Sequence, residues 1–203
     1  MASQIAHVIY TKKYLEQYPR VDADLFILGT LFVDIRRIAK EINRSATHHA
    51  FHKIDLNFSD LSAFQAGWKF HLWCDMKREE ILNKYKFYLL KHTTELGHLP
   101  AKLLEDEILY GKYDNWEKLG YLLNNPPVIK LDLPIEQKTI ERWYAIIAKY
   151  FEKKPDDKTM KAFLFKQSSL RKKSADIVDV VRKLRNNRIA AEILSGVPGE
   201  ILG

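Results

Sequence analysis

The chain has 203 residues, of which 46% are hydrophobic and 29% are charged, and these values are typical of one globular domain. Its eight glycines and seven prolines are too few for an all-β sandwich or barrel with many tight turns. No apolar run approaches the roughly 18 residues of a membrane-spanning helix, the first residues do not resemble a signal peptide, and the single cysteine, Cys74, excludes an internal disulfide. We therefore expect a cytoplasmic protein without a transmembrane segment.

In the first third of the chain, the spacing of apolar residues predicts three helical segments. The first covers 3–17 and ends before Pro19. The second begins at Asp22 or Asp24, either of which can cap it, and contains Gly29, where we expect close packing or a break. The third covers 34–42. Residues 45–58 show no regular pattern, apart from one or two helical turns through 48–51.

A long helix is expected over 61–92, capped by Ser59 or Asp60 and broken near 77–80, and a linker over 93–100 follows it. Further helical patterns cover 101–111, 114–123, 135–152, 157–167 and 174–194, with a loop at 124–127. The pattern of 128–133 fits a short strand that has no evident partner. We predict an all-α bundle of about seven to nine helices, with 1–194 as a single domain and 195–203 as a flexible end.

The histidines are concentrated near the beginning of the chain. Five of the seven lie within the first 71 residues, and they are His7, His48, His49, His52 and His71. His71 and Asp75 are four residues apart in a helical pattern, so their side chains share one face of the helix. Such a pair can bind one divalent cation, although a hydrogen bond between the two side chains explains the same spacing.

Asp34 is a carboxylate within the apolar run Leu31-Phe-Val-Asp-Ile. A buried carboxylate needs a cationic partner or a metal. Arg36 or Arg37 can provide that partner, and Asp34 can equally be the N-cap of the 35–42 helix.

The remaining candidate ligands are on other elements. His48 and His52 share a face if their segment is helical, and at most one of His48 and His49 is expected to share a metal with Asp34. The predicted metal ligands are His7, Asp34, His48, His71 and Asp75, with His49 and His52 as possible additions. All are ligand types for zinc or a similar ion, including manganese or iron.

These residues resemble the zinc-dependent phospholipase C family, whose all-α fold is shared with certain single-strand-specific nucleases. The resemblance rests on His7, on Leu28-Gly-Thr-Leu-Phe-Val-Asp34, on Thr47-His48 and on Gly67-x3-His71-x3-Asp75. It covers roughly residues 1–80, with a weaker similarity near 103–110.

The resemblance implies that Asp34, His48, His71 and Asp75 surround one metal ion, and that Asp75 bridges to a second ion held partly by His7. It further implies hydrolysis of a phosphoester or phosphodiester by a metal-activated water, which Asp34 orients or deprotonates. The substrate class, whether lipid, nucleotide or nucleic acid, stays open.

The sequence also departs from the family. Only His92 and His98 follow Asp75, and neither has a glutamate four residues later, as a further metal site in the family requires. The secreted members begin with a metal-binding tryptophan after processing, and this chain has none. These departures favour a cytoplasmic metal-dependent phosphoesterase over a secreted phospholipase.

The alternative is a non-catalytic helical module. Residues 153–188 contain twelve lysines and arginines against four aspartates, and this basic region can bind an anionic partner such as nucleic acid or an acidic protein. A helical phosphohydrolase with an adjacent His-Asp pair ranks well below the metal-dependent phosphoesterase because that dipeptide does not occur, and no Gly-rich phosphate loop is present.

Overall fold

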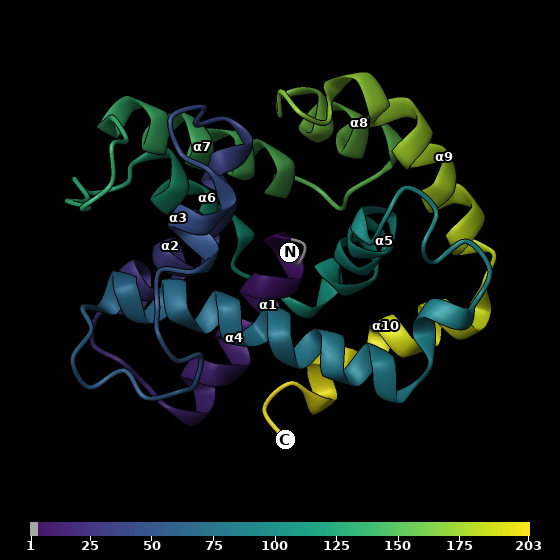
Figure 1. Ribbon diagram of the computed structural model, residues 1–203, viewed down its shortest axis with the longest axis horizontal. Helices are drawn as coiled ribbons and strands as arrows, with labels where there is room; N and C mark the ends of the chain where they lie inside the picture. The colour runs from purple at the N-terminus through teal and green to yellow at the C-terminus, as the bar shows by residue number, and fades with distance from the viewer. Residues whose placement is uncertain (1–3) are drawn as a thin grey trace.

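The structure confirms the all-α fold. The computed structural model describes residues 4–203, and within them the chain forms ten α-helices, four short 3₁₀ helices and no strand (Figure 1). The α-helices are α1 (Gln4–Gln17), α2 (Ala23–Phe32), α3 (Arg44–His48), α4 (Ala63–Lys84), α5 (Leu99–Leu109), α6 (Trp116–Asn124), α7 (Gln137–Phe151), α8 (Asp157–Phe165), α9 (Ser174–Arg185) and α10 (Arg188–Glu200). The 3₁₀ helices are η1 (Val33–Arg37), η2 (Phe87–Leu89), η3 (Tyr110–Lys112) and η4 (Arg171–Lys173).

Helix α1 is the central element. Figure 1 shows it in the middle of the molecule, and it packs against α2, α4, α5 and α10. Every residue from Gln4 to Thr11 is buried, so this half of the helix is enclosed on all sides. Two acidic residues of α5 hold it in place: Asp106 accepts a hydrogen bond from the Ala6 backbone N–H at 3.0 Å, and Glu105 accepts one from the Tyr10 hydroxyl. His7 therefore lies in the interior.

Helices α2 and α4 cross with their backbones in contact. A Cβ atom added at Gly29 would lie 1.9 Å from the Phe64 carbonyl oxygen, and one added at Gly67 would lie 1.9 Å from the Phe26 carbonyl oxygen. The Thr30 hydroxyl donates to the Gly67 carbonyl at 3.1 Å across the same crossing. Of the two expectations for Gly29, close packing is correct, because only a residue without a side chain fits there.

Helix α4 begins later than predicted and has no break. Its N-cap is Ser62 rather than Ser59 or Asp60, and Ser62 forms a capping box with Gln65 in which each side chain accepts the other's backbone N–H. The predicted break near 77–80 was wrong, because Arg78 is completely buried there and its Nε donates to Glu105 of α5 at 2.7 Å. The helix ends at Lys84, just before Lys86 adopts a left-handed φ of 52°.

The segment between α2 and α4 also differs from the prediction. The helix expected over 34–42 is only the 3₁₀ helix η1, and the turns expected through 48–51 are instead α3, which begins earlier because Asn43 caps it by accepting the Ala46 N–H. The predicted strand over 128–133 does not form. Ile129, Leu131 and Leu133 pack against the core from an irregular segment, since no neighbouring strand is present among the described residues.

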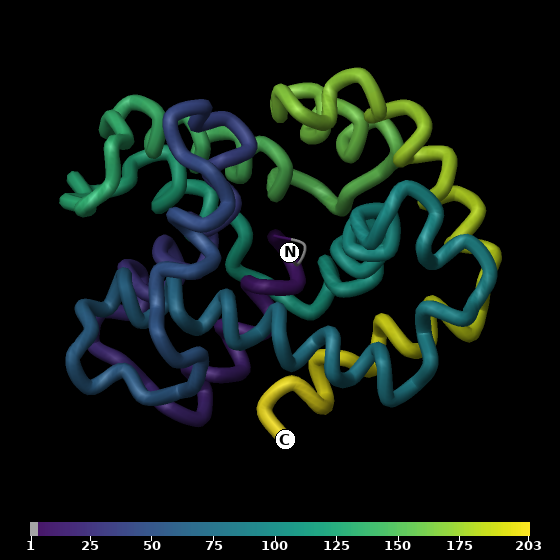
Figure 2. Tube along the Cα trace, in the orientation of Figure 1, coloured from purple at the N-terminus to yellow at the C-terminus, as the bar shows by residue number. Residues whose placement is uncertain are grey.

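The C-terminal part contains two helices where one was predicted over 174–194. Helix α9 ends at Arg185, and Asn187 caps α10 by accepting the Ala190 N–H. The flexible end expected over 195–203 is helical as far as Glu200, because Val197 and Ile201 are buried in the core. Figure 2 shows this last, yellow stretch running back beside the teal chain, where α10 packs on α4 and α5.

The other helical predictions agree with the structure to within two residues at each end. Across the described residues, none of the helices combines the length and the apolar character needed to cross a bilayer.

Candidate metal centre

Helices α1 and α4 bring three of the predicted ligands together. His7, His71 and Asp75 each offer a ligand atom, and these atoms lie within 4.8 Å of one another. The two imidazole rings are stacked with their centroids 3.8 Å apart. His7 and His71 are completely buried, whereas the Asp75 side chain retains 14% exposure, so the group is reached from the Asp75 side.

The distances within this group suit a shared cation better than direct hydrogen bonds. Nε2 of His7 lies 3.6 Å from Oδ1 of Asp75, and Nε2 of His71 lies 3.7 Å from Oδ2 of Asp75. Both separations exceed hydrogen-bond length. Two donors on one tetrahedral zinc ion, each about 2.1 Å from the metal, are about 3.4 Å apart. The spacing is therefore close to that of ligand pairs on a metal.

The backbone of α2 determines which nitrogen of His71 faces the group. Nδ1 of His71 lies 2.7 Å from the carbonyl oxygen of Thr30. Because a carbonyl only accepts, Nδ1 must carry the proton and Nε2 presents its lone pair. Nε2 is buried and makes no hydrogen bond with any described residue. A metal-binding histidine commonly has this arrangement, with the second nitrogen donating to a backbone carbonyl.

Burial sets the protonation states that metal binding requires. The pKa of His71 is well below its ordinary value, first because the ring is buried and second because His7 lies beside it. Burial raises the pKa of Asp75, but its interactions with surrounding groups, including the adjacent His7 and His71 side chains, outweigh burial and hold the pKa well below its ordinary value. A neutral imidazole and an ionised carboxylate are the ligand forms of these residues.

His48 lies next to the group. Its ring is perpendicular to that of His71, with the centroids 6.2 Å apart. Nδ1 of His48 is 2.9 Å from the Thr47 hydroxyl, and Nε2 is buried without a hydrogen bond to any described residue. Burial lowers the pKa of His48 to about 4, although Asp34 and Asp75 act in the opposite direction. His48 is thus a neutral imidazole beside the group, with both carboxylates close enough to affect its charge, but the described ligand atoms that lie within 4.8 Å of one another are those of His7, His71 and Asp75 alone.

Asp34 occupies the other side of His48. It lies inside η1, so the alternative that it caps a 35–42 helix was wrong. Its Oδ2 accepts a hydrogen bond from Gln4 at 3.3 Å, and its Oδ1 is 3.9 Å from the Arg36 guanidinium. The predicted arginine partner is therefore Arg36, and the carboxylate is buried between this cation and the histidines.

The remaining histidines lie outside the group. His49 and His52 are both exposed, and neither joins the three clustered ligands. His92 pairs with Glu95, and His98 stacks on Tyr88 with the ring centroids 4.3 Å apart.

Two residues that organise the centre could not be recognised from the sequence pattern. Thr30 acts through its carbonyl oxygen, which every residue type has, so only the position of α2 reveals it. Gln4 binds Asp34 from α1, and a lone glutamine near the beginning of the chain carries no pattern.

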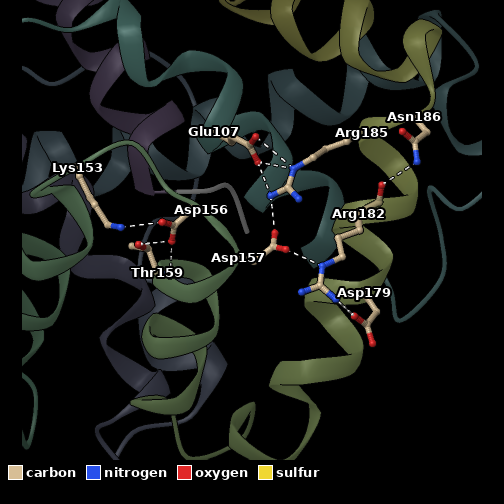
Figure 3. Close-up of polar contacts among 9 residues, drawn as sticks. All are labelled: Glu107, Lys153, Asp156, Asp157, Thr159, Asp179, Arg182, Arg185 and Asn186. Carbon is tan, nitrogen blue, oxygen red and sulfur yellow. Dashed lines mark hydrogen bonds and ion pairs between the residues drawn. The ribbon is translucent and has the colours of Figure 1, made fainter.

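Much of the charge in the basic region 153–188 is paired within the fold. Figure 3 shows Arg185 between Glu107 of α5 and Asp157 of α8, at 2.8 and 2.7 Å, and Arg182 between Asp157 and Asp179. Lys153 binds Asp156, which in turn caps α8. These contacts join α5, α8 and α9, so part of the region serves the fold rather than an anionic partner.

Comparisons of the chain with protein-family models, with curated proteins and with solved structures find no match.

Proposed function

We propose that this chain is a metal-dependent hydrolase that acts on a phosphoester or phosphodiester, as its resemblance to the zinc-dependent phospholipase C family implies. The observation that carries the proposal is the convergence of His7, His71 and Asp75 within 4.8 Å, from two helices that are far apart in sequence. A bound zinc, manganese or iron ion would supply a water nucleophile of lowered pKa and charge stabilisation for the phosphoryl oxygens.

The protein's own residues have separate roles in this proposal. His7, His71 and Asp75 would hold the metal, and His48 lies beside them. Thr30 holds His71 in the tautomer whose Nε2 is available. Asp34 accepts a proton from the nucleophile, and Arg36 and Gln4 hold its carboxylate in position.

A cytoplasmic location belongs to this proposal. Cys74 is the only cysteine and is buried, so the fold uses no disulfide and suits a reducing compartment.

The test is metal analysis combined with a hydrolysis assay. Purified protein should hold one or more zinc-like ions per chain and hydrolyse bis(4-nitrophenyl) phosphate. His71→Ala and Asp75→Ala should each lose the metal and the activity, and His52→Ala is the matched control, because His52 is an exposed histidine outside the group.

Two results would overturn the proposal: a wild-type protein that resists metal loading, or both variants keeping the metal. An inactive protein that binds polyanions, with an affinity that falls steeply as salt rises, would instead support the non-catalytic binding module.

A further inference from the structure

A cationic cleft lies beside the candidate metal centre. Its volume is about 700 Å³, and four basic side chains line it: Arg37, Arg44, Lys102 and Lys173. The acidic residue in the lining is Glu79, which already binds Arg78 and the Tyr88 hydroxyl. Most of the other lining residues are leucines and an isoleucine, beside Gly97, His98 and Ser169, so the cleft combines positive charge with a partly apolar surface.

Lys102 is the most deeply buried cation of this cleft. Only 4% of the residue is exposed, its backbone N–H donates to the His98 carbonyl at 3.3 Å, and its side chain forms no ion pair within the described part of the chain. It borders both this cleft and a smaller cavity of about 20 Å³ that Asp34 and Asp106 also line. An anion in the cleft would form an ion pair with its ammonium group.

The N-terminus of α5 adds to the positive field. His98 is the N-cap of this helix but forms no side-chain capping hydrogen bond, and Leu99, the first helical residue, lines the cleft. The first N–H groups of a helix carry partial positive charge and bind phosphate or sulfate readily. The cleft therefore contains a helix N-terminus in addition to its four cationic side chains.

The cleft and the metal centre are built from the same three elements. In α3, His48 belongs to the centre and Arg44, one turn earlier, lines the cleft. In α4, Asp75 belongs to the centre and Glu79, one turn later, lines the cleft. In η1, Asp34 lies on the side of the centre, and Arg37, one 3₁₀ turn later, lines the cleft. The two sites are therefore about one helical turn apart along each of these elements.

We propose that this cleft binds a phosphate group that the substrate carries in addition to the ester attacked at the metal centre. The substrate is then an organophosphate with at least two phosphate groups, such as a nucleotide or a short oligonucleotide. A lipid with one phosphate next to a quaternary ammonium group does not fit, because the ammonium would face four cations. The choice of substrate rests on the proposed function, whereas the phosphate binding does not.

The first experiment measures the binding of inorganic phosphate to metal-free protein by calorimetry. Lys173→Glu should weaken this binding at least tenfold. Lys172→Glu is the matched control, because Lys172 is exposed, adjacent and outside the cleft lining, and it should change the affinity less than twofold. Lys102→Met should also abolish binding while the protein keeps its helical circular dichroism. His71→Ala should bind phosphate normally, which separates this site from the metal centre.

The second experiment compares two substrates in metal-loaded protein: bis(4-nitrophenyl) phosphate and a 4-nitrophenyl ester of a nucleotide that carries a second phosphate. For each variant, kcat/KM for the second substrate is divided by kcat/KM for the first. This ratio should be at least fivefold lower in Lys173→Glu than in Lys172→Glu.

Equal losses in Lys173→Glu and Lys172→Glu, or unchanged phosphate binding in Lys173→Glu, would overturn the cleft assignment. An absence of hydrolysis in the wild type with intact phosphate binding would refute the proposed function alone.

Discussion

The carbonyl oxygen of Thr30 lies 2.7 Å from Nδ1 of His71, and this contact directs the other ring nitrogen toward Asp75. The contact exists because α2 and α4 touch at Gly29 and Gly67, one residue before Thr30 and four residues before His71. The helix crossing and the candidate metal centre are therefore one structural unit.

Gly67→Ala should damage both parts of this unit. The new Cβ would lie 1.9 Å from the Phe26 carbonyl oxygen, which is backbone and cannot move aside. We expect a loss of about 2–3 kcal/mol in the free energy of unfolding, as for overpacked cores, together with weaker metal binding. Denaturant unfolding and metal titration measure the two effects. Gly120→Ala is the control: nothing lies within 4 Å of its Cβ, and it should gain up to about 1 kcal/mol. Equal stabilities of the two variants would contradict the crossing.

His7→Ala distinguishes one bound ion from two. His7 faces Oδ1 of Asp75 and His71 faces Oδ2, so one ion held by all three residues and two ions that share Asp75 predict different metal contents. For the single shared ion, elemental analysis of dialysed protein should find about one metal ion per wild-type chain and almost none in His7→Ala or Asp75→Ala. About two ions in the wild type and about one in His7→Ala would contradict the shared site.

Arg78→Met should strongly destabilise the fold. Arg78 and Glu105 are both completely buried and paired at 2.7 Å, so the substitution leaves an uncompensated carboxylate. The expected loss is about 3–5 kcal/mol, measured by urea unfolding. The double variant Arg78→Met with Glu105→Leu should recover most of it, since no unpaired charge remains. Arg188→Ala removes an exposed pair with Glu192 and should cost less than about 1 kcal/mol.

The Asp55–Lys69 contact should make stability depend on pH at the acid end. Nζ of Lys69 donates to Asp55 at 2.6 Å, and this hydrogen bond is the main reason why the pKa of Asp55 is lowered to about 2. In the unfolded chain the pKa is about 3.9. Because the folded pKa is the lower one, the stabilisation is complete above about pH 4 and disappears as the pH falls toward 2.

Asp55→Asn should therefore unfold more easily than the wild type at pH 6, and the two proteins should converge near pH 2. Urea unfolding across this range measures the difference, with Asp60→Asn as an exposed control. A difference that stays constant with pH would rule out the ion pair as its cause.

The sequence predicted most helices because their apolar residues recur at helical spacing, and the helices of the fold bury those same residues in the core. It failed where a single local contact decides the outcome. Ser62 replaces Ser59 and Asp60 as the cap of α4 because Gln65 completes a capping box. Buried Arg78 keeps α4 continuous through a stretch whose pattern changes.

The sequence by itself determined the all-α class and the i,i+4 placement of His71 and Asp75, since both depend on periodicity along the chain. Only the tertiary structure decided that His7 stacks on His71, that Thr30 orients His71, and that Lys102 is buried beside a cationic cleft. It also decided that Arg182 and Arg185 form ion pairs with Asp157 of α8 and that Arg185 pairs with Glu107 of α5. These relationships join residues far apart in the chain, and no local spacing specifies which side chains the packing of helices will bring together.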